Sequence, residues 1–251
     1  MRWRSARDHV EKHMNSTRFA AVAVLVFAFG MVFEGQEMRS QEAATKYLHM
    51  APVEEYLITD RTAEITLART AAPESISRDA TILVLGRRGY ETAVEGKNGF
   101  VCVVQRSWTL PFDSPEFWNP RVRLPLCMNP PGARFNLPLT FKTEELASAG
   151  LSKNQMSGRL KAAYDNKELP VPEHGSMCYM MSKQQYFGDK EGNAGDSHLM
   201  FWFPQGEHMD WGADASDSPV NVHQYTPQPI TEFTISVAKW SDGTVASAYQ
   251  R

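Results

Sequence analysis

The chain has 251 residues with a net charge of −3 at neutral pH, and 42% of its residues are hydrophobic and 22% charged. This composition is typical of a globular protein and excludes a disordered chain. Residues 1–33 carry a charge of +3, which leaves −6 on residues 34–251, so no basic stripe remains to neutralise phosphates. We therefore expect no nucleic-acid partner.

The N-terminus has the pattern of an export signal. A segment with five Arg and Lys residues precedes the uncharged 15-residue run FAAVAVLVFAFGMVF at 19–33. This run is shorter than the roughly 20 residues that a membrane-spanning helix needs, and a polar segment follows it. We predict an exported protein, periplasmic or extracellular, in which residues 1–33 are a cleaved signal peptide. A retained N-terminal anchor, with residues 19–33 as a membrane tether, is the alternative.

Residues 34–251 fit a single domain that is large enough for a substantial core. Its first clear helix is expected in DRTAEITLARTAAP, where Asp60 is a candidate N-cap. The apolar residues of this segment recur at a helical spacing, at Ala63, Leu67 and Ala71. We expect this helix to cover one face of a sheet.

The stretch 79–108 predicts a three-stranded meander. The apolar runs ATILVL (80–85), YETAVE (90–95) and FVCVVQ (100–105) are separated by GRRG and GKNG, whose glycines suit tight turns. Both faces of the third run are apolar, so something must cover both sides of this strand.

Residues 110–138 change in character, with seven prolines and four aromatic residues. Such a segment is expected to be neither a helix nor a central strand. We predict an ordered loop over the core, pinned near Cys127. In an oxidising compartment, a disulfide between Cys102 and Cys127 would close a loop of about 25 residues. The alternative is that these two and Cys178 are small buried hydrophobes.

The remainder predicts helices and then strands. A short helix is expected at 143–149, and Ser152 with Gln155 forms a capping box that starts another. The apolar runs MCYMMS (177–182), HLMFWF (198–203) and TEFTISVAKW (231–240) are typical of strands. The predicted fold is α+β, an antiparallel or mixed sheet of about six strands with helices packed on it, preceded by the signal or anchor segment.

Five segments together resemble a group of exported bacterial proteins of unknown function. They are WNPRVRLPLCMNPPGARFNLPL, SMCYMMSK, HLMFWF, WGA (211–213) and WSDGT (240–244). The likeness covers most of residues 60–245. It implies export, and it brings no activity with it, because these residues are not a catalytic signature.

The sequence contains no recognisable catalytic motif. The runs HGSMC and GLSKN lack the second glycine of a nucleophile elbow, and GKNG lacks the flanking residues of a phosphate loop. GxGxxG, HExxH and paired-carboxylate motifs are also missing. The sequence therefore indicates no cofactor and favours a non-enzymatic protein, without deciding the question.

The last third holds the candidate binding residues His174, His198, His208 and Trp211. Neutral imidazoles that converge with a carboxylate can bind a transition metal. The candidate metal ligands are therefore His198, His208 and Asp210. The alternative is that these histidines are scattered over loops and strand ends.

Three functional hypotheses follow from these observations. The leading one is a non-catalytic exported domain that binds a small ligand or a cell-envelope partner. The second is a metal-dependent envelope enzyme that uses the C-terminal histidines. The third is a purely structural subunit, for which a large exposed apolar patch would be the sign.

Overall fold

The computed structural model describes residues 46–189, 195–206, 211–213 and 215–246, and the elements below belong to the unit formed by residues 47–251. The predicted signal or anchor segment, residues 1–33, lies outside the described residues. No helix in the described part of the chain is long and apolar enough to cross a membrane.

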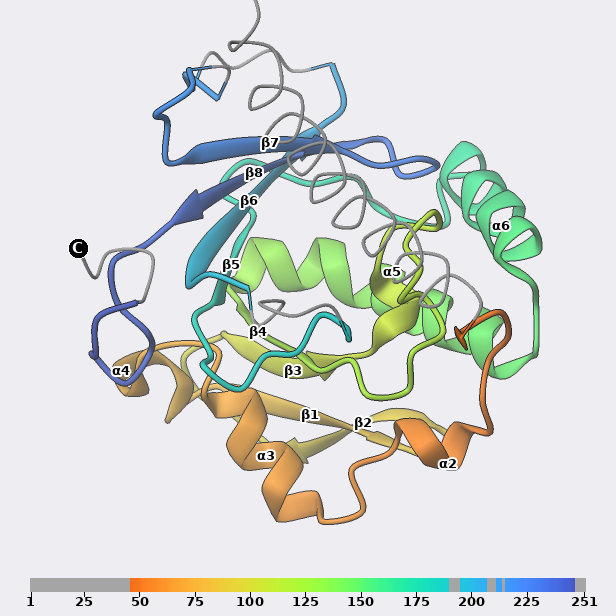
Figure 1. The fold of residues 1–251 in the computed structure, drawn as a ribbon, viewed down its shortest axis with the longest axis horizontal. Helices are drawn as coiled ribbons and strands as arrows, with labels where there is room; N and C mark the ends of the chain where they lie inside the picture. Colours follow the sequence, from red (N-terminus) through yellow and green to blue (C-terminus); the bar gives the residue numbers. More distant parts are fainter. Residues whose placement is uncertain (1–45, 190–194, 207–210, 214, 247–251) are drawn as a thin grey trace, which may run out of the picture. The chain divides into compact units, whose positions relative to one another are not determined.

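The strands form one mixed, eight-stranded sheet in the order β2-β1-β3-β4-β5-β6-β8-β7 (Figure 1). This result confirms the α+β class and corrects the predicted strand number. The strands are β1 (Thr81–Gly86), β2 (Gly89–Val94), β3 (Val101–Gln105), β4 (Leu124–Met128), β5 (Met177–Met180), β6 (His198–Pro204), β7 (Val220–Gln224) and β8 (Ile230–Ser236). The helices are α2 (Val53–Tyr56), α3 (Arg61–Arg69), α4 (Glu74–Ser77), η1 (Ser107–Thr109), α5 (Pro130–Ser148) and α6 (Lys153–Asp165).

The first three strands exist as predicted, but they do not form a meander. β1 and β2 make an antiparallel hairpin, whereas β3 pairs with the other edge of β1 in parallel. Between β2 and β3 the chain crosses the start of β1, where the amide of Lys97 donates to the carbonyl of Asp79 at 2.9 Å. A Cβ on Gly96 would lie 2.1 Å from the backbone nitrogen of Thr81, so this close crossing requires glycine.

β4 is a central strand within the proline-rich stretch that the sequence predicted to be a loop. The amide of Arg123, just before β4, donates to the carbonyl of Tyr186 at 2.9 Å on the β5 side. Amides two residues apart on a strand point to the same side, so Pro125 faces that side too. β5 pairs only with the last two residues of β4, and the missing N–H of Pro125 therefore interrupts no ladder.

α5 also begins inside the proline-rich stretch, well before the helix expected at 143–149. Its first residues are prolines, which the first turn of a helix tolerates because the amides there lack helical partners. The side chain of Asn129 accepts a hydrogen bond from the amide of Gly132 at 2.9 Å and caps the helix. Pro138 lies inside the helix and removes one internal hydrogen bond. Burial of Phe135 and Leu146 on the same helix offsets that cost.

β7 is the second strand that the sequence reading missed. It forms one edge of the sheet and pairs with β8 alone. Four of its five residues are exposed, so it lacks the apolar run by which the other strands were recognised. β4 and β7 together account for the difference between the predicted and the observed number of strands.

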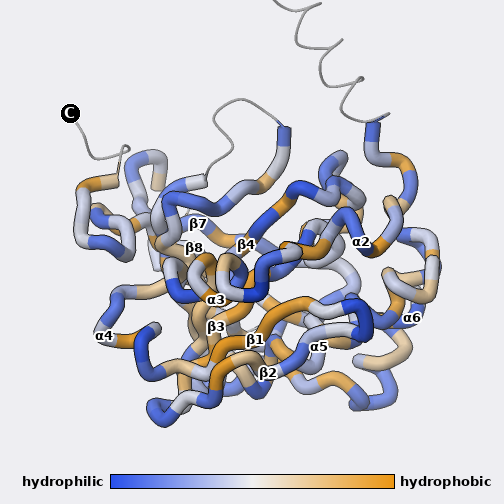
Figure 2. Tube along the Cα trace, turned by 90° about the horizontal axis from the view of Figure 1, so that it is seen from below, coloured by the Kyte–Doolittle hydropathy of each residue, from blue (hydrophilic) through white to orange (hydrophobic). Residues whose placement is uncertain are grey.

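Helices cover both faces of the sheet. α3, capped by Asp60 as predicted, packs on β1, β3 and β4. Its Ala68 belongs to the buried cluster that also contains Ile82, Val104 and the two strand cysteines, whereas Ala63, which the spacing predicted to face the sheet, is exposed. On the other face the sheet curls around α5, which Figure 1 shows enclosed between β3 and β6. β1 and β3 are the hydrophobic centre of this arrangement (Figure 2).

The predicted pairing of Cys102 with Cys127 is confirmed. The two residues are direct partners in the β3–β4 ladder, their Cα atoms are 3.9 Å apart, and their sulfurs form a disulfide. The bond therefore joins two central strands on the face that α3 covers.

Candidate functional site

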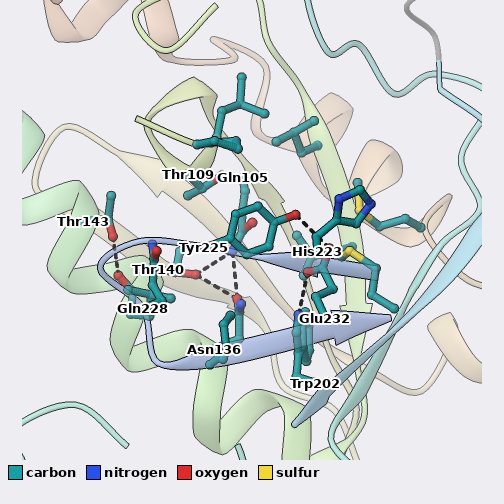
Figure 3. A pocket seen from close by; sticks show the side chains of 18 of the residues that line it. Gln105, Thr109, Asn136, Thr140, Thr143, Trp202, His223, Tyr225, Gln228 and Glu232 are labelled. Carbon is teal, nitrogen blue, oxygen red and sulfur yellow. Dashed lines mark hydrogen bonds between the residues drawn. The ribbon is translucent and has the colours of Figure 1, made fainter. Parts of the chain in front are cut away.

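A cavity of about 320 Å³ lies between the concave face of the sheet and α5 (Figure 3). Its lining comes from β3, β4, β5, β6, β7 and β8 on one side, and from α5, α6 and the loop after β3 on the other. The volume is at the lower end of the range that small-molecule sites occupy.

Alternate residues of three strands build the sheet wall of the cavity. Side chains of a strand alternate between its two faces, so residues two apart share a face. The residues that line the cavity are His198, Met200 and Trp202 of β6, Ile230, Glu232 and Thr234 of β8, and His223 of β7, followed by Tyr225. In register, Trp202 lies opposite Glu232, and Glu232 lies opposite His223. These three residues therefore form one row across the sheet.

One stripe of α5 builds the facing wall. Asn136, Leu139, Thr140 and Thr143 line the cavity and follow the spacing of residues on one helical face. Across from them, the side-chain amide of Gln105 donates to Asn136 Oδ1 at 2.8 Å and to Thr140 Oγ1 at 2.5 Å. This polar network ties β3 to α5 and fixes the width of the cavity at that point.

Glu232 is the acidic residue of the cavity wall, and it is only 7% exposed. Trp202 Nε1 donates to its Oε2 at 2.8 Å, and the hydroxyl of Tyr225 donates to its Oε1 at 3.0 Å (Figure 3). Burial, and then the negative charge of Glu232, raise the pKa of Tyr225, so this hydroxyl keeps its proton and remains a donor. Both partners of the carboxylate are thus neutral groups.

His198 contributes an imidazole with a defined tautomer. Its Nδ1 lies 2.6 Å from the carbonyl oxygen of Asp196. Because that oxygen can only accept, Nδ1 carries the proton, and Nε2 is an acceptor in the neutral ring. Burial lowers the pKa of His198, which keeps the ring neutral at pH 7.

Two buried polar atoms of the cavity residues have no hydrogen-bond partner within the described residues. They are Nε1 of Trp108, a donor, and Oε1 of Gln228, an acceptor. Buried polar atoms in folded proteins are nearly all satisfied, by protein groups, by water or by a ligand. Both atoms have almost no accessible surface, so they lie behind the cavity wall and are not open to a ligand in this structure.

The structure separates the residues that the sequence singled out. His198 lines the cavity, but His174 lies in an exposed turn. Trp211 stacks on Phe233, 4.7 Å between ring centroids, on the opposite face of the sheet. His208 and Asp210 lie outside the described residues. Over the described ranges, no three His, Cys, Asp or Glu side chains gather in a way that could hold a metal ion.

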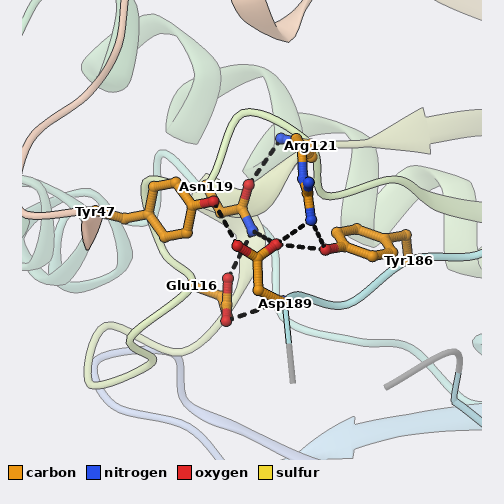
Figure 4. A network of polar contacts seen from close by, with 6 residues as sticks. All are labelled: Tyr47, Glu116, Asn119, Arg121, Tyr186 and Asp189. Carbon is orange, nitrogen blue, oxygen red and sulfur yellow. Dashed lines mark hydrogen bonds and ion pairs between the residues drawn. The ribbon is translucent and has the colours of Figure 1, made fainter. Parts of the chain in front are cut away.

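A second polar cluster surrounds Asp189, and none of the six residues drawn in Figure 4 lines the cavity. The hydroxyl of Tyr47 donates to Asp189 Oδ2 at 2.8 Å, and Arg121 and Tyr186 both bind Oδ1. Asn119 donates to the buried Glu116 at 2.6 Å and to Asp189 at 3.2 Å. Because Arg121 pairs with the charge of Asp189 and the other contacts come from separate parts of the chain, this cluster fastens three chain segments together.

Sequence reasoning missed most of the cavity, including Glu232, Tyr225 and Asn136. One signal was present: ITEFTIS at 230–236 holds a single charged residue in phase with Ile230 and Thr234. A lone carboxylate on the inward phase of a buried strand is unusual, because burying a charge is costly. It marks a candidate position even before a structure is known.

Comparison with known proteins adds no further assignment. No protein-family model matches the chain, and neither the curated proteins nor the solved structures yield a match. The predicted kinship with exported bacterial proteins stays a prediction. The function must therefore be argued from the geometry of the site itself.

Proposed function

We propose that this chain is an exported, non-catalytic binding protein that holds a small molecule in the cavity between α5 and the sheet. The observation that carries the proposal is a cavity of ligand size whose largely apolar lining includes two buried polar side chains, Glu232 and His198. Apolar walls with a few placed polar groups are the usual composition of small-molecule sites.

The disulfide supports the exported setting. Disulfides persist in oxidising compartments and are rare in the cytosol. The Cys102–Cys127 bond is buried in the centre of the sheet, where both cysteines are inaccessible to solvent. The predicted signal segment at 1–33 also supports export.

The proposal can be tested by blocking the cavity. Met200 lines it from β6, so Met200→Trp would fill the cavity with an indole ring. Phe201 is the next residue of the same strand, and its ring lies on the opposite face near Trp211, so Phe201→Trp is a matched control. A library of small fragments would be screened against both variants and the wild-type protein by saturation-transfer NMR.

We expect fragments that bind the wild-type protein to bind Phe201→Trp equally and to lose binding to Met200→Trp. Circular dichroism and thermal unfolding would verify that both variants fold. Equal binding by Met200→Trp and wild type, or a wild-type protein that binds no fragment, would overturn the proposal.

A further inference from the structure

We propose that the cavity is selective for small organic cations, amines with an apolar body, and that Glu232 supplies the counter-charge. This inference rests on the proposed function, since it names the class of ligand for the same cavity. It depends on the surroundings of one carboxylate and on the charges of the residues around it.

The partners of Glu232 leave its charge uncompensated. Each oxygen accepts one hydrogen bond, from Trp202 and from Tyr225, and each has capacity for another. Both donors are neutral, and the ion pairs found among the described residues do not include Glu232. A carboxylate that is 7% exposed and lacks a cation carries a desolvation cost that a bound cation would offset.

The rest of the cavity lining also favours a cationic ligand over an anionic one. The described residues that line it include neither lysine nor arginine, so none of these long cationic side chains is present there to neutralise an anionic ligand. Five aromatic rings line the space near the hydrocarbon side chains, those of Trp108, Phe112, Phe187, Trp202 and Tyr225. Aromatic surfaces attract cations as well as apolar groups, whereas they offer no compensation to an anion.

Neither histidine of the cavity replaces the missing cation. Burial lowers the pKa of His198, so its ring is neutral at pH 7. His223 lies opposite Glu232 in the β7–β8 ladder, yet its ring stacks on that of Tyr225 instead of pairing with the carboxylate. The position beside Glu232 is thus left for a charge that comes from outside the chain.

Three probes of similar shape and different charge test this selectivity with the full chain. Phenethylamine is a cation at pH 7.5, phenethyl alcohol is neutral, and phenylacetate is an anion. Their dissociation constants would be measured by NMR titration for the wild-type protein and for Glu232→Gln. The variant keeps the size of the side chain and removes its charge.

We expect the amine to bind the wild-type protein about tenfold or more tightly than the alcohol, as one charge-assisted hydrogen bond provides, and phenylacetate to bind most weakly. Glu232→Gln should remove the preference for the amine over the alcohol. An amine that binds no more tightly than the alcohol, or a preference that survives Glu232→Gln, would overturn the inference. The wild-type comparison is informative even if the variant does not fold.

Failure of this inference is distinguishable from failure of the proposed function. If fragments bind the wild-type protein in a manner that Met200→Trp abolishes, yet the amine has no advantage, the cavity binds ligands but does not select cations. If no fragment binding depends on the cavity, the proposed function itself is wrong.

Discussion

Glu64 and Glu232 are both buried carboxylates, but their surroundings are opposite. Glu64, on α3, is 1% exposed and forms an ion pair with Arg106 at 2.8 Å, while Leu85 donates a backbone hydrogen bond to the same oxygen at 3.1 Å. Glu232, on β8, accepts hydrogen bonds from two neutral donors, and no cation within the described residues pairs with it. The first is neutralised by the chain itself, and the second is not.

The pairing with Arg106 gives Glu64 a structural role, whereas Glu232 is the carboxylate that we propose binds a ligand. Arg106 is fully buried and also donates to backbone carbonyls of Tyr56 and Val104, so it joins α2, α3 and β3 in one sealed network. Glu64 also borders a hollow of about 470 Å³, but its charge is already paired with Arg106. Glu232 stands at the wall of a cavity, where its remaining lone pairs are useful only to a molecule that enters.

Removing the cation of the sealed pair should have the largest effect on stability. Arg106→Met leaves Glu64 as a buried charge without a counter-ion, and we expect a loss of about 3–5 kcal/mol in the free energy of unfolding. Urea denaturation followed by circular dichroism would measure it. The double variant Glu64→Gln/Arg106→Met should recover part of the loss, because it removes the stranded charge. A loss no greater than that of an exposed substitution would contradict the proposed role of the pair.

Removal of the disulfide beneath α3 should cause the next largest loss in the free energy of unfolding. Cys102→Ala/Cys127→Ala removes a cross-link over a sequence separation of 25 residues. We expect a loss of about 2–4 kcal/mol, mainly because the unfolded chain regains conformational freedom. Dithiothreitol should lower the stability of the wild-type protein to that of the variant and leave the variant unchanged. A wild-type protein that is insensitive to the reductant under unfolding conditions would show that the bond does not form.

Neutralising the cavity carboxylate should cost far less than disrupting the sealed pair. In Glu232→Gln the side-chain oxygen can still accept from Trp202, and the new amide can donate to the oxygen of Tyr225. Since a buried charge is removed at the same time, we expect stability to change by less than about 1 kcal/mol. The same urea titration gives the comparison with Arg106→Met. A loss as large as that of Arg106→Met would place Glu232 in the structural class with Glu64.

The sequence predicted the elements whose signals are local. Asp60 caps α3, and Ser152 with Gln155 forms the capping box of α6, because a cap is decided by residues three or fewer positions apart. The apolar runs located β1, β2, β3, β5, β6 and β8. The pairing of Cys102 with Cys127 could also be predicted from the sequence, because an exported protein is oxidised and the two cysteines are 25 residues apart.

The features that the sequence did not reveal depend on non-local packing. Pro125 argues against a central strand unless one knows that β5 does not reach it. The parallel pairing of β1 with β3 depends on the chain crossing the start of β1 at Gly96. The glycines of GKNG are equally compatible with a hairpin turn, so the sequence does not reveal this crossing. The cavity collects residues from Gln105 to Thr234, so only the lone charge of Glu232 gave a local sign of it.

The smallest predicted effect is the contribution of His198 to the pH dependence of stability. Burial lowers its pKa in the folded protein, opposed by the hydrogen bond to the Asp196 carbonyl and by the charges of Glu232 and Asp196, while His223 lowers the pKa further. Protons then bind the unfolded chain in preference to the folded one. Stability should therefore fall as the pH decreases from about 6.5, the ordinary histidine pKa, through the lowered value in the fold.

His198→Asn isolates this contribution, because the side-chain amide can replace Nδ1 as donor to the Asp196 carbonyl without titrating. Free energies of unfolding measured between pH 4 and 8 should decline less steeply in this variant than in the wild-type protein, while His174→Asn, at an exposed turn, should retain the wild-type slope. Identical slopes for all three proteins would mean that the His198 ring accepts a proton in the fold as readily as in the unfolded chain. Burial would then not disfavour a positive charge at this position of the cavity wall.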